Sequence, residues 1–221
     1  MTKQKRKAGR PKGTKAKGKR GGLAPNQYLD DKQLARLLRY VSLEAEEARR
    51  WGRKRAVVNN IIVNILVYSG LRADELCKLN IRDLPSYHEK NQIFVCSGKG
   101  SISRTIDIPE ALAKRLSRFV RLHRKGAKPD KPFLVGERGK RLSYRGLYSR
   151  IKSIGERTGL PELHPHTLRH TFGTRLYNLE HDLFYVQDQL GHKSTDTTKR
   201  YAKTNNTARR RQTEKMDMGI D

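Results

Sequence analysis

The sequence predicts a mainly helical α+β domain with a small antiparallel sheet, over residues 29–205, behind a disordered basic arm. Apolar residues recur at helical spacing along most of this domain. One stretch, 91–108, instead alternates on both sides of a glycine-containing turn, which is typical of a β-hairpin. Residues 1–28 consist largely of Lys, Arg and Gly and offer too few apolar side chains to build a core.

The first helices are predicted in the N-terminal half of the domain. Asp30 and Asp31 are candidate helix caps, and the helical spacing of apolar residues that follows them ends at Val41. A polar, charged stretch then continues to about Lys54. The next predicted helices are 57–68, which is mostly buried and ends at Gly70, and 73–79.

The hairpin and the remaining helices follow. Its strands are predicted at 93–96 and 102–108, joined by the turn Ser-Gly-Lys-Gly at 97–100. Pro109 is expected to open a helix that runs to about His123. The other predicted elements are a short apolar strand at 133–135, helices at 143–157, 167–179 and 182–190, a short helix leading to Tyr201, and a polar tail at 206–221.

The charge of the chain indicates a polyanionic partner. Lys and Arg number 49 against 22 Asp and Glu, which gives a formal net charge of +27. Residues 1–22 hold ten of these cations and no acid, so removing them from the count still leaves +17. Because each phosphate contact releases a condensed counterion, the expected partner is nucleic acid.

The basic arm contains a short motif of its own. Residues 7–12 read Lys-Ala-Gly-Arg-Pro-Lys, and the Gly-Arg-Pro core resembles an AT-hook that lies in a narrow minor groove. The usual hook has Arg before the Gly, where this chain has Ala8. A generic arm that contacts phosphates only is the alternative. The candidate DNA-contacting residues are Arg6, Lys7, Arg10 and Lys12.

Several protein classes are excluded by the composition. The two cysteines, Cys77 and Cys96, fit neither a disulfide framework nor a zinc site, and the N-terminus lacks the apolar stretch of a secretory signal. The strongest apolar run, 57–67, contains three asparagines and is too short to cross a bilayer. We expect a cytoplasmic, nucleoid-associated protein with no membrane partner, no metal and no cofactor.

Four blocks place reactive side chains at turns and helix starts. They are Gly70–Leu76, Ser97–Gly100, His166–His170, and Leu190–His192 with Tyr201 nine residues later. Phosphodiester strand exchange needs a nucleophile, a base, an acid for the leaving 5′-oxygen, and cations over the non-bridging oxygens. The blocks contain a candidate for each task. Taken singly, each of these residues is more often a surface or capping group.

In this order and spacing, the blocks resemble the catalytic domain of the tyrosine recombinases, the phage integrase family. The family signature of Arg, Lys, His, Arg, His or Trp, and Tyr is matched by Arg72, Lys99, His166, Arg169, His192 and Tyr201. The resemblance covers about 29–205. His164 and His170 stand outside the signature and are interpreted as structural or capping groups.

The resemblance implies a role for each matched residue. Tyr201 would attack the scissile phosphate and form a 3′-phosphotyrosyl link, and Arg72 and Arg169 would hold the non-bridging oxygens. His192 would donate a further hydrogen bond to that phosphate, and Lys99 would protonate the leaving oxygen. The two remaining positions are His166, the proton acceptor for the tyrosine, and Glu75, an acidic position that would orient the cations.

The implied activity is metal- and ATP-independent integration, excision or inversion of double-stranded DNA, by a homotetramer on paired sites. Family members usually carry a core-binding domain before the catalytic one, and we expect the basic arm to replace it here. The polar segment after Tyr201 has few apolar residues for exchange between protomers. A type IB topoisomerase, a non-catalytic DNA-binding accessory protein and a chromatin-type architectural protein remain as alternatives.

Overall fold

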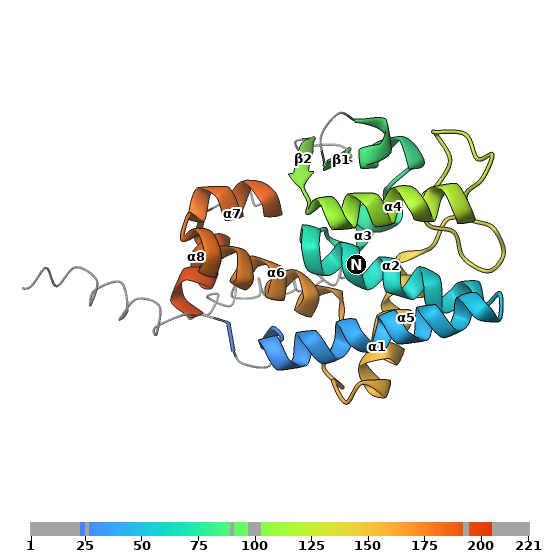
Figure 1. Ribbon diagram of the computed structural model, residues 1–221. Coiled ribbons are helices and arrows are strands. Elements are labelled where there is room, and N and C mark those ends of the chain that lie inside the picture. Colours follow the sequence, from blue (N-terminus) through green and yellow to red (C-terminus); the bar gives the residue numbers. More distant parts are fainter. Residues whose placement is uncertain (1–22, 25–26, 89–90, 97–102, 192–194, 205–221) are drawn as a thin grey trace, which may run out of the picture.

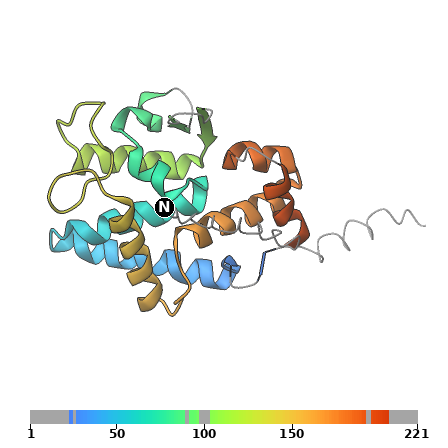
Figure 2. The ribbon, with the colours of Figure 1, turned by 180° about the vertical axis from the view of Figure 1, so that it is seen from behind.

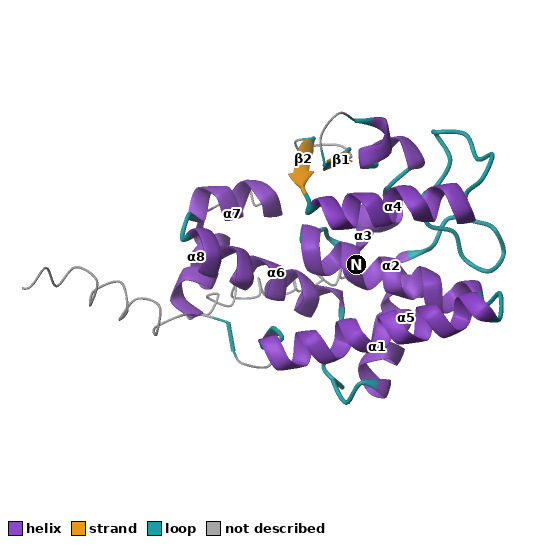
Figure 3. Ribbon diagram, viewed as in Figure 1, coloured by secondary structure: helices purple, strands orange, loops and turns teal. Residues whose placement is uncertain are grey.

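The computed structural model describes residues 23–24, 27–88, 91–96, 103–191 and 195–204 (Figure 1). Helices make up most of the described residues. These residues also contain a two-stranded antiparallel sheet (Figure 3). The predicted fold class is therefore confirmed. The elements in order are α1 (Asp31–Arg50), α2 (Lys54–Ser69), α3 (Ala73–Lys78), η2 (Ile81–Asp83), η3 (Pro85–Tyr87), β1 (Gln92–Val95), β2 (Arg104–Asp107), α4 (Glu110–His123), α5 (Tyr144–Arg157), α6 (Pro165–Glu180), α7 (Leu183–Leu190) and α8 (Thr195–Thr204).

Helix α2 is the centre of the core. Its residues are apolar around most of the circumference, so it is covered on several sides, by α1, α4, α5 and α6. Ile62, Ile65 and Leu66 have no exposed surface. Among the described residues, no helix combines the length and the apolar character that a membrane span needs.

Helix α6 connects the core around α2 with the pair of helices α7 and α8. It packs against α2 at one end, while α7 and α8 lie together at its other end, as the front and back views show (Figures 1 and 2). Strand β2 also contacts α7. The segments around residues 72, 104, 169 and 191 are thereby brought close together, although they are far apart in the sequence.

Helix α1 is longer than the sequence predicted. Asp30 caps it as expected, with its side chain accepting from the Gln33 amide at 2.8 Å. The helix continues through the polar stretch to Arg50 because Ala45 and Ala48 are buried and the Tyr40 hydroxyl donates to Glu44 at 2.6 Å. Burial of these two small apolar residues stabilises the second half of α1, although the opposite side of the helix is exposed to solvent.

The two strands of the hairpin were predicted correctly, and the strand at 133–135 was not. The predicted turn at 97–100 lies outside the described residues. Strands β1 and β2 pair antiparallel, with Gln92 opposite Asp107 and Val95 opposite Arg104. The segment 133–135 takes part only in an isolated bridge between Val135 and Arg141. Its buried Phe133 donates its amide to the Leu79 carbonyl, so the segment is held by the end of α3 and the core instead of a second sheet.

Gly70 ends α2 in the left-handed conformation, as predicted, with φ of 61°. A methyl group there would lie 2.3 Å from Phe172 Cδ1 and 2.9 Å from Leu190 Cδ2. We therefore expect Gly70→Ala to lower the free energy of unfolding by about 2–4 kcal/mol, combining backbone strain with overpacking. Urea unfolding of the purified protein measures this change.

The matched control is Gly159→Ala. Gly159 also has a positive φ, 66°, but a methyl group there meets nothing within 4 Å, so this variant carries the strain without the clash. Its expected loss is about 1–2 kcal/mol. Equal losses in the two variants would contradict the packing argument at Gly70.

Candidate active site

The site begins where α2 ends and α3 starts. Glu75 lies in the first turn of α3, and its carboxylate accepts from the Arg72 amide at 2.8 Å and from Arg72 Nη1 at 3.0 Å. The second terminal nitrogen of Arg72 donates to the Gly191 carbonyl at 3.1 Å. The Arg72 side chain is still 37% exposed, so the guanidinium is held on one side and accessible on the other.

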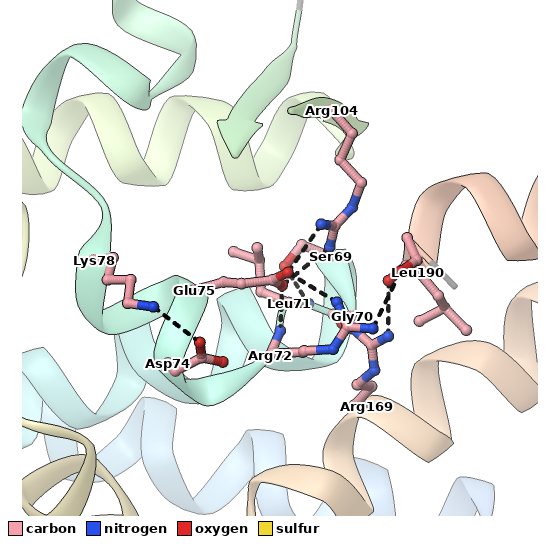
Figure 4. A network of polar contacts seen from close by, with 11 residues as sticks. Ser69, Gly70, Leu71, Arg72, Asp74, Glu75, Lys78, Arg104, Arg169 and Leu190 are labelled. Atoms are coloured by element: carbon pink, nitrogen blue, oxygen red, sulfur yellow. Dashed lines mark hydrogen bonds and ion pairs between the residues drawn. The ribbon is translucent and has the colours of Figure 1, made fainter. Parts of the chain in front are cut away.

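A second arginine, Arg104, also binds the Glu75 carboxylate. Arg104 Nη1 and Nη2 donate to the two carboxylate oxygens at 2.9 and 3.0 Å (Figure 4). Burial alone would raise the pKa of Glu75, but the hydrogen bonds from Arg104 and from the Arg72 amide bring it down to about 2. Glu75 is therefore ionised at neutral pH.

Arg169, on α6, is buried between Gly70, which ends α2, and Leu190, at the end of α7. Only 4% of the residue is exposed, and its guanidinium donates to the Gly70 carbonyl at 2.6 Å and to the Leu190 carbonyl at 2.7 Å (Figure 4). Burial and the positive charge of Arg72 lower the pKa of Arg169 to about 10. Arg169 and Arg72 thus contact consecutive carbonyls, those of Leu190 and Gly191, at the end of α7.

Tyr201, on α8, lies beside these arginines and is 1% exposed. Its ring packs over Gly173 of α6, where an added methyl group would lie 2.7 Å from the tyrosine Cζ. Burial raises the pKa of the hydroxyl, while the charges of Arg169, Arg200 and Arg72 oppose the rise. The absence of a side chain at Gly173 is what lets α8 bring the ring this close to α6.

The histidines of α6 differ in what they contact. His164 caps the helix, as predicted, and its Nδ1 accepts from the Thr167 amide at 3.3 Å. His166, which the resemblance predicts to accept the tyrosine proton, is exposed. His170, interpreted from the sequence as structural or capping, instead places its Nδ1 3.1 Å from the Tyr201 hydroxyl.

The environment of His170 has a measurable consequence for stability. Burial, followed by the charge of Arg200, lowers its pKa from 6.5 to about 4. The folded protein therefore binds fewer protons here than the unfolded chain does. The stability that His170 contributes is present above about pH 6.5 and is lost as the pH falls toward 4, by at most about 3 kcal/mol.

We expect His170→Gln to remove this part of the acid sensitivity. Urea unfolding at several pH values between about 4 and 7.5 measures the slope for the wild type and the variant. His166→Gln, which changes an exposed histidine on the same helix, is the control. If His170→Gln and the wild type lose stability in parallel, the assignment to His170 is wrong.

The structure therefore brings together Arg72, Glu75, Arg169 and Tyr201 of the candidate residues. Lys99, His192 and the arm residues Arg6, Lys7, Arg10 and Lys12, with the AT-hook-like motif, lie outside the described residues. Sequence reasoning missed two residues that contact the candidate residues: Arg104, which binds Glu75, and His170, which contacts Tyr201. The available signals were a charged residue within the predicted second strand, and a histidine next to Arg169.

The model of the phage integrase family matches residues 27–208, which is most of the chain. The chain belongs to the phage integrase family. The match includes the segments that carry Arg72, Arg169 and Tyr201.

Curated relatives in this family are tyrosine recombinases. The tyrosine recombinase XerC of Pseudomonas fluorescens is 34% identical over 140 residues, which are 63% of this chain and 46% of that protein. The tyrosine recombinase XerA of Pyrococcus furiosus is 33% identical over 154 residues, 68% of this chain and 51% of that protein. The chain spans about half the length of these relatives.

Solved structures show the same fold. A crystal structure of XerA recombinase superposes with a TM-score of 0.70 and 28% identity, over 86% of this chain and 64% of that one. The Tn1549 transposon integrase in complex with transposon right-end DNA gives a TM-score of 0.68 and 23% identity, over 87% of this chain and 67% of that one. The second likeness concerns the fold alone.

Proposed function

We propose that the protein is a site-specific DNA recombinase that cuts and rejoins DNA strands through a 3′-phosphotyrosyl intermediate, without metal or ATP. One observation carries the proposal: two arginines from distant segments contact consecutive carbonyls beside a buried tyrosine. Paired guanidinium groups suit the non-bridging oxygens of a phosphodiester, and a phenol next to them is a nucleophile of the right kind. Membership of the phage integrase family supports the same reading.

The proposed first step balances as a transesterification. The Tyr201 oxygen bonds to phosphorus and its proton passes to a base, the role that the family gives to His166. The bond from phosphorus to the 5′-oxygen breaks, and Lys99 supplies the proton that this oxygen takes up. Arg72, Arg169 and His192 would stabilise the charge on the non-bridging oxygens. Reversal by another 5′-hydroxyl rejoins the strand, because the phosphotyrosyl bond retains the energy of the broken ester.

The buried state of Tyr201 places a requirement on this step. Its hydroxyl contacts His170 and the residue is 1% exposed, so the oxygen must become accessible before it can reach a phosphate. Movement of α8 relative to α6 upon DNA binding would achieve this. His170, neutral at pH 7 because burial lowers its pKa, would hold the hydroxyl until then.

Two further features of the proposal concern binding. The ten cations of residues 1–22 would wrap the duplex electrostatically, in the compartment that contains the DNA. Assembly as a homotetramer on paired sites would couple the strand exchanges. Leu179 and Phe184, each 74% exposed near the turn from α6 to α7, supply apolar surface of the kind that protein contacts use.

The test uses two supercoiled plasmids, one with the DNA that flanks the gene of this protein and one with unrelated DNA. After quenching with denaturant, covalent protein–DNA adduct is measured, and peptide mapping identifies the residue attached to DNA. Adduct on the flanking DNA alone, through Tyr201, supports the proposal. Equal adduct and relaxation on both plasmids indicate a type IB topoisomerase, and tight binding without adduct indicates a DNA-binding accessory protein.

A further inference from the structure

Arg104 is a largely buried cation, with 11% of its side chain exposed, that the family signature does not contain. Its two terminal nitrogens bind both oxygens of Glu75 in a bidentate pair (Figure 4). Such pairs restrict orientation as well as distance, because two parallel hydrogen bonds must form together. Arg104 therefore holds the Glu75 carboxylate in one orientation.

The same guanidinium also lies against the end of α7. A methyl group on Gly191 would be 2.7 Å from Arg104 Cζ and from its Nε. Within the described residues, this Nε is buried and has no hydrogen-bond partner. Three residues along β2, Asp107 exchanges hydrogen bonds of 3.2 Å with Gln189 of α7. Strand β2 is thus attached to α3 through Arg104 and to α7 through Asp107.

The charges explain why two arginines share one carboxylate. If Glu75 paired with Arg72 alone, it would neutralise the guanidinium that is meant for the phosphate. With Arg104 added, three guanidinium groups, those of Arg72, Arg104 and Arg169, accompany one carboxylate, which leaves a net charge of +2 on these four side chains. A surplus of positive charge that is fixed in place is what a pentacovalent phosphorane, with its added negative charge, requires.

We propose that Arg104 is a positioning residue for DNA cleavage: it clamps Glu75, so that Arg72 remains aimed at the scissile phosphate, and it ties strand β2 to α3. The inference rests on the proposed function. Arg104 acts through Glu75 and Arg72 and does not itself touch the reacting atoms. Its loss should therefore change the rate and its pH dependence, beyond any change in stability.

The variants are Arg104→Met, which removes the charge, and Arg104→Lys, which keeps the charge but not the bidentate fork. Arg141→Met is the matched control. Arg141 anchors the other end of the same short helix, since its Nη1 donates to the Cys77, Lys78 and Leu79 carbonyls at 2.8–3.1 Å. It serves the stability of α3 without contacting Arg72 or Glu75.

The full-length protein and its variants are incubated with the plasmid that carries the flanking DNA, between about pH 5 and pH 8. The initial rate of covalent adduct formation and the thermal unfolding midpoint are measured for each. We expect Arg104→Met to reduce the rate about 10–10²-fold near neutral pH, because a small misplacement of a phosphate-binding group has an effect of that order. Arg104→Lys should recover part of the lost rate.

The pH profile separates positioning from stability. The charged groups that face Glu75 are Arg72 on its own helix, Arg104 on β2 and Arg169 on α6. Without Arg104, fewer hydrogen bonds and positive charges offset the effect of burial on Glu75. The pKa of this carboxyl therefore rises, and its negative charge is lost at a higher pH. The rate of Arg104→Met should therefore begin to fall at a higher pH than that of the wild type or of Arg104→Lys.

The outcomes are distinct. A slower rate with a shifted acidic limb in Arg104→Met, together with a wild-type profile in Arg141→Met, supports the positioning role. Identical profiles in Arg104→Met and Arg141→Met, at similar unfolding midpoints, would show that Arg104 only stabilises the fold. Absence of adduct with the wild-type protein would overturn the proposed function, and the positioning role with it.

Discussion

Tyr201→Phe is expected to abolish covalent attachment to DNA while leaving the fold and DNA binding intact. The phenylalanine ring can occupy the same space over Gly173, so the buried packing is kept. The hydrogen bond between the hydroxyl and His170 at 3.1 Å is lost, and such a bond is worth about 1 kcal/mol of stability. A denaturing gel detects the adduct, and a gel shift of the flanking DNA measures binding.

The control for this variant is Tyr177→Phe. Tyr177 packs against the same small apolar cluster as Tyr201, so both changes remove a hydroxyl from one region of the molecule. Adduct formation should persist in Tyr177→Phe. A wild-type amount of adduct in Tyr201→Phe would mean that another residue is the nucleophile, and the assignment of the site would be wrong.

Arg169→Lys is expected to reduce the rate of adduct formation by about 10²–10³-fold, the effect of removing one fixed donor from a charged transition state. Lysine keeps the charge, but a single ammonium group cannot reproduce the planar fork that reaches the Gly70 and Leu190 carbonyls together. At least one buried carbonyl would lose its partner, which costs about 1–3 kcal/mol of stability. Single-turnover cleavage and urea unfolding measure the two effects.

Arg175→Lys is the matched control for that experiment. Arg175 lies on the same helix, its side chain is 46% exposed, and it pairs with Asp31 at the surface. Exposed ion pairs contribute little, so this variant should retain the wild-type rate and nearly the wild-type stability. Equal rates in the two lysine variants would argue against a role for Arg169 at the phosphate.

Local sequence patterns predicted the element types well. The apolar run at 57–68 lies in the central helix, Gly70 ends that helix, and the two alternating segments pair as strands β1 and β2. The errors lie where tertiary contacts outweighed local pattern. The first helix continues to Arg50, since α1 packs against α2 and Ala45 and Ala48 are buried, and the segment at 133–135 is hydrogen-bonded to the end of α3.

The sequence by itself determined the fold class, most of the helices, the basic character and the choice of Arg72, Arg169 and Tyr201 as candidates. Only the tertiary structure decided which groups meet. Arg104 binds Glu75 across 29 positions of sequence, and His170 reaches the Tyr201 hydroxyl across 31. Periodicity reports which side of a helix or strand is apolar. From the sequence alone, an arginine in a strand is expected to be an ordinary surface cation. Only the tertiary structure shows that Arg104 is largely removed from water and paired with the carboxylate of Glu75.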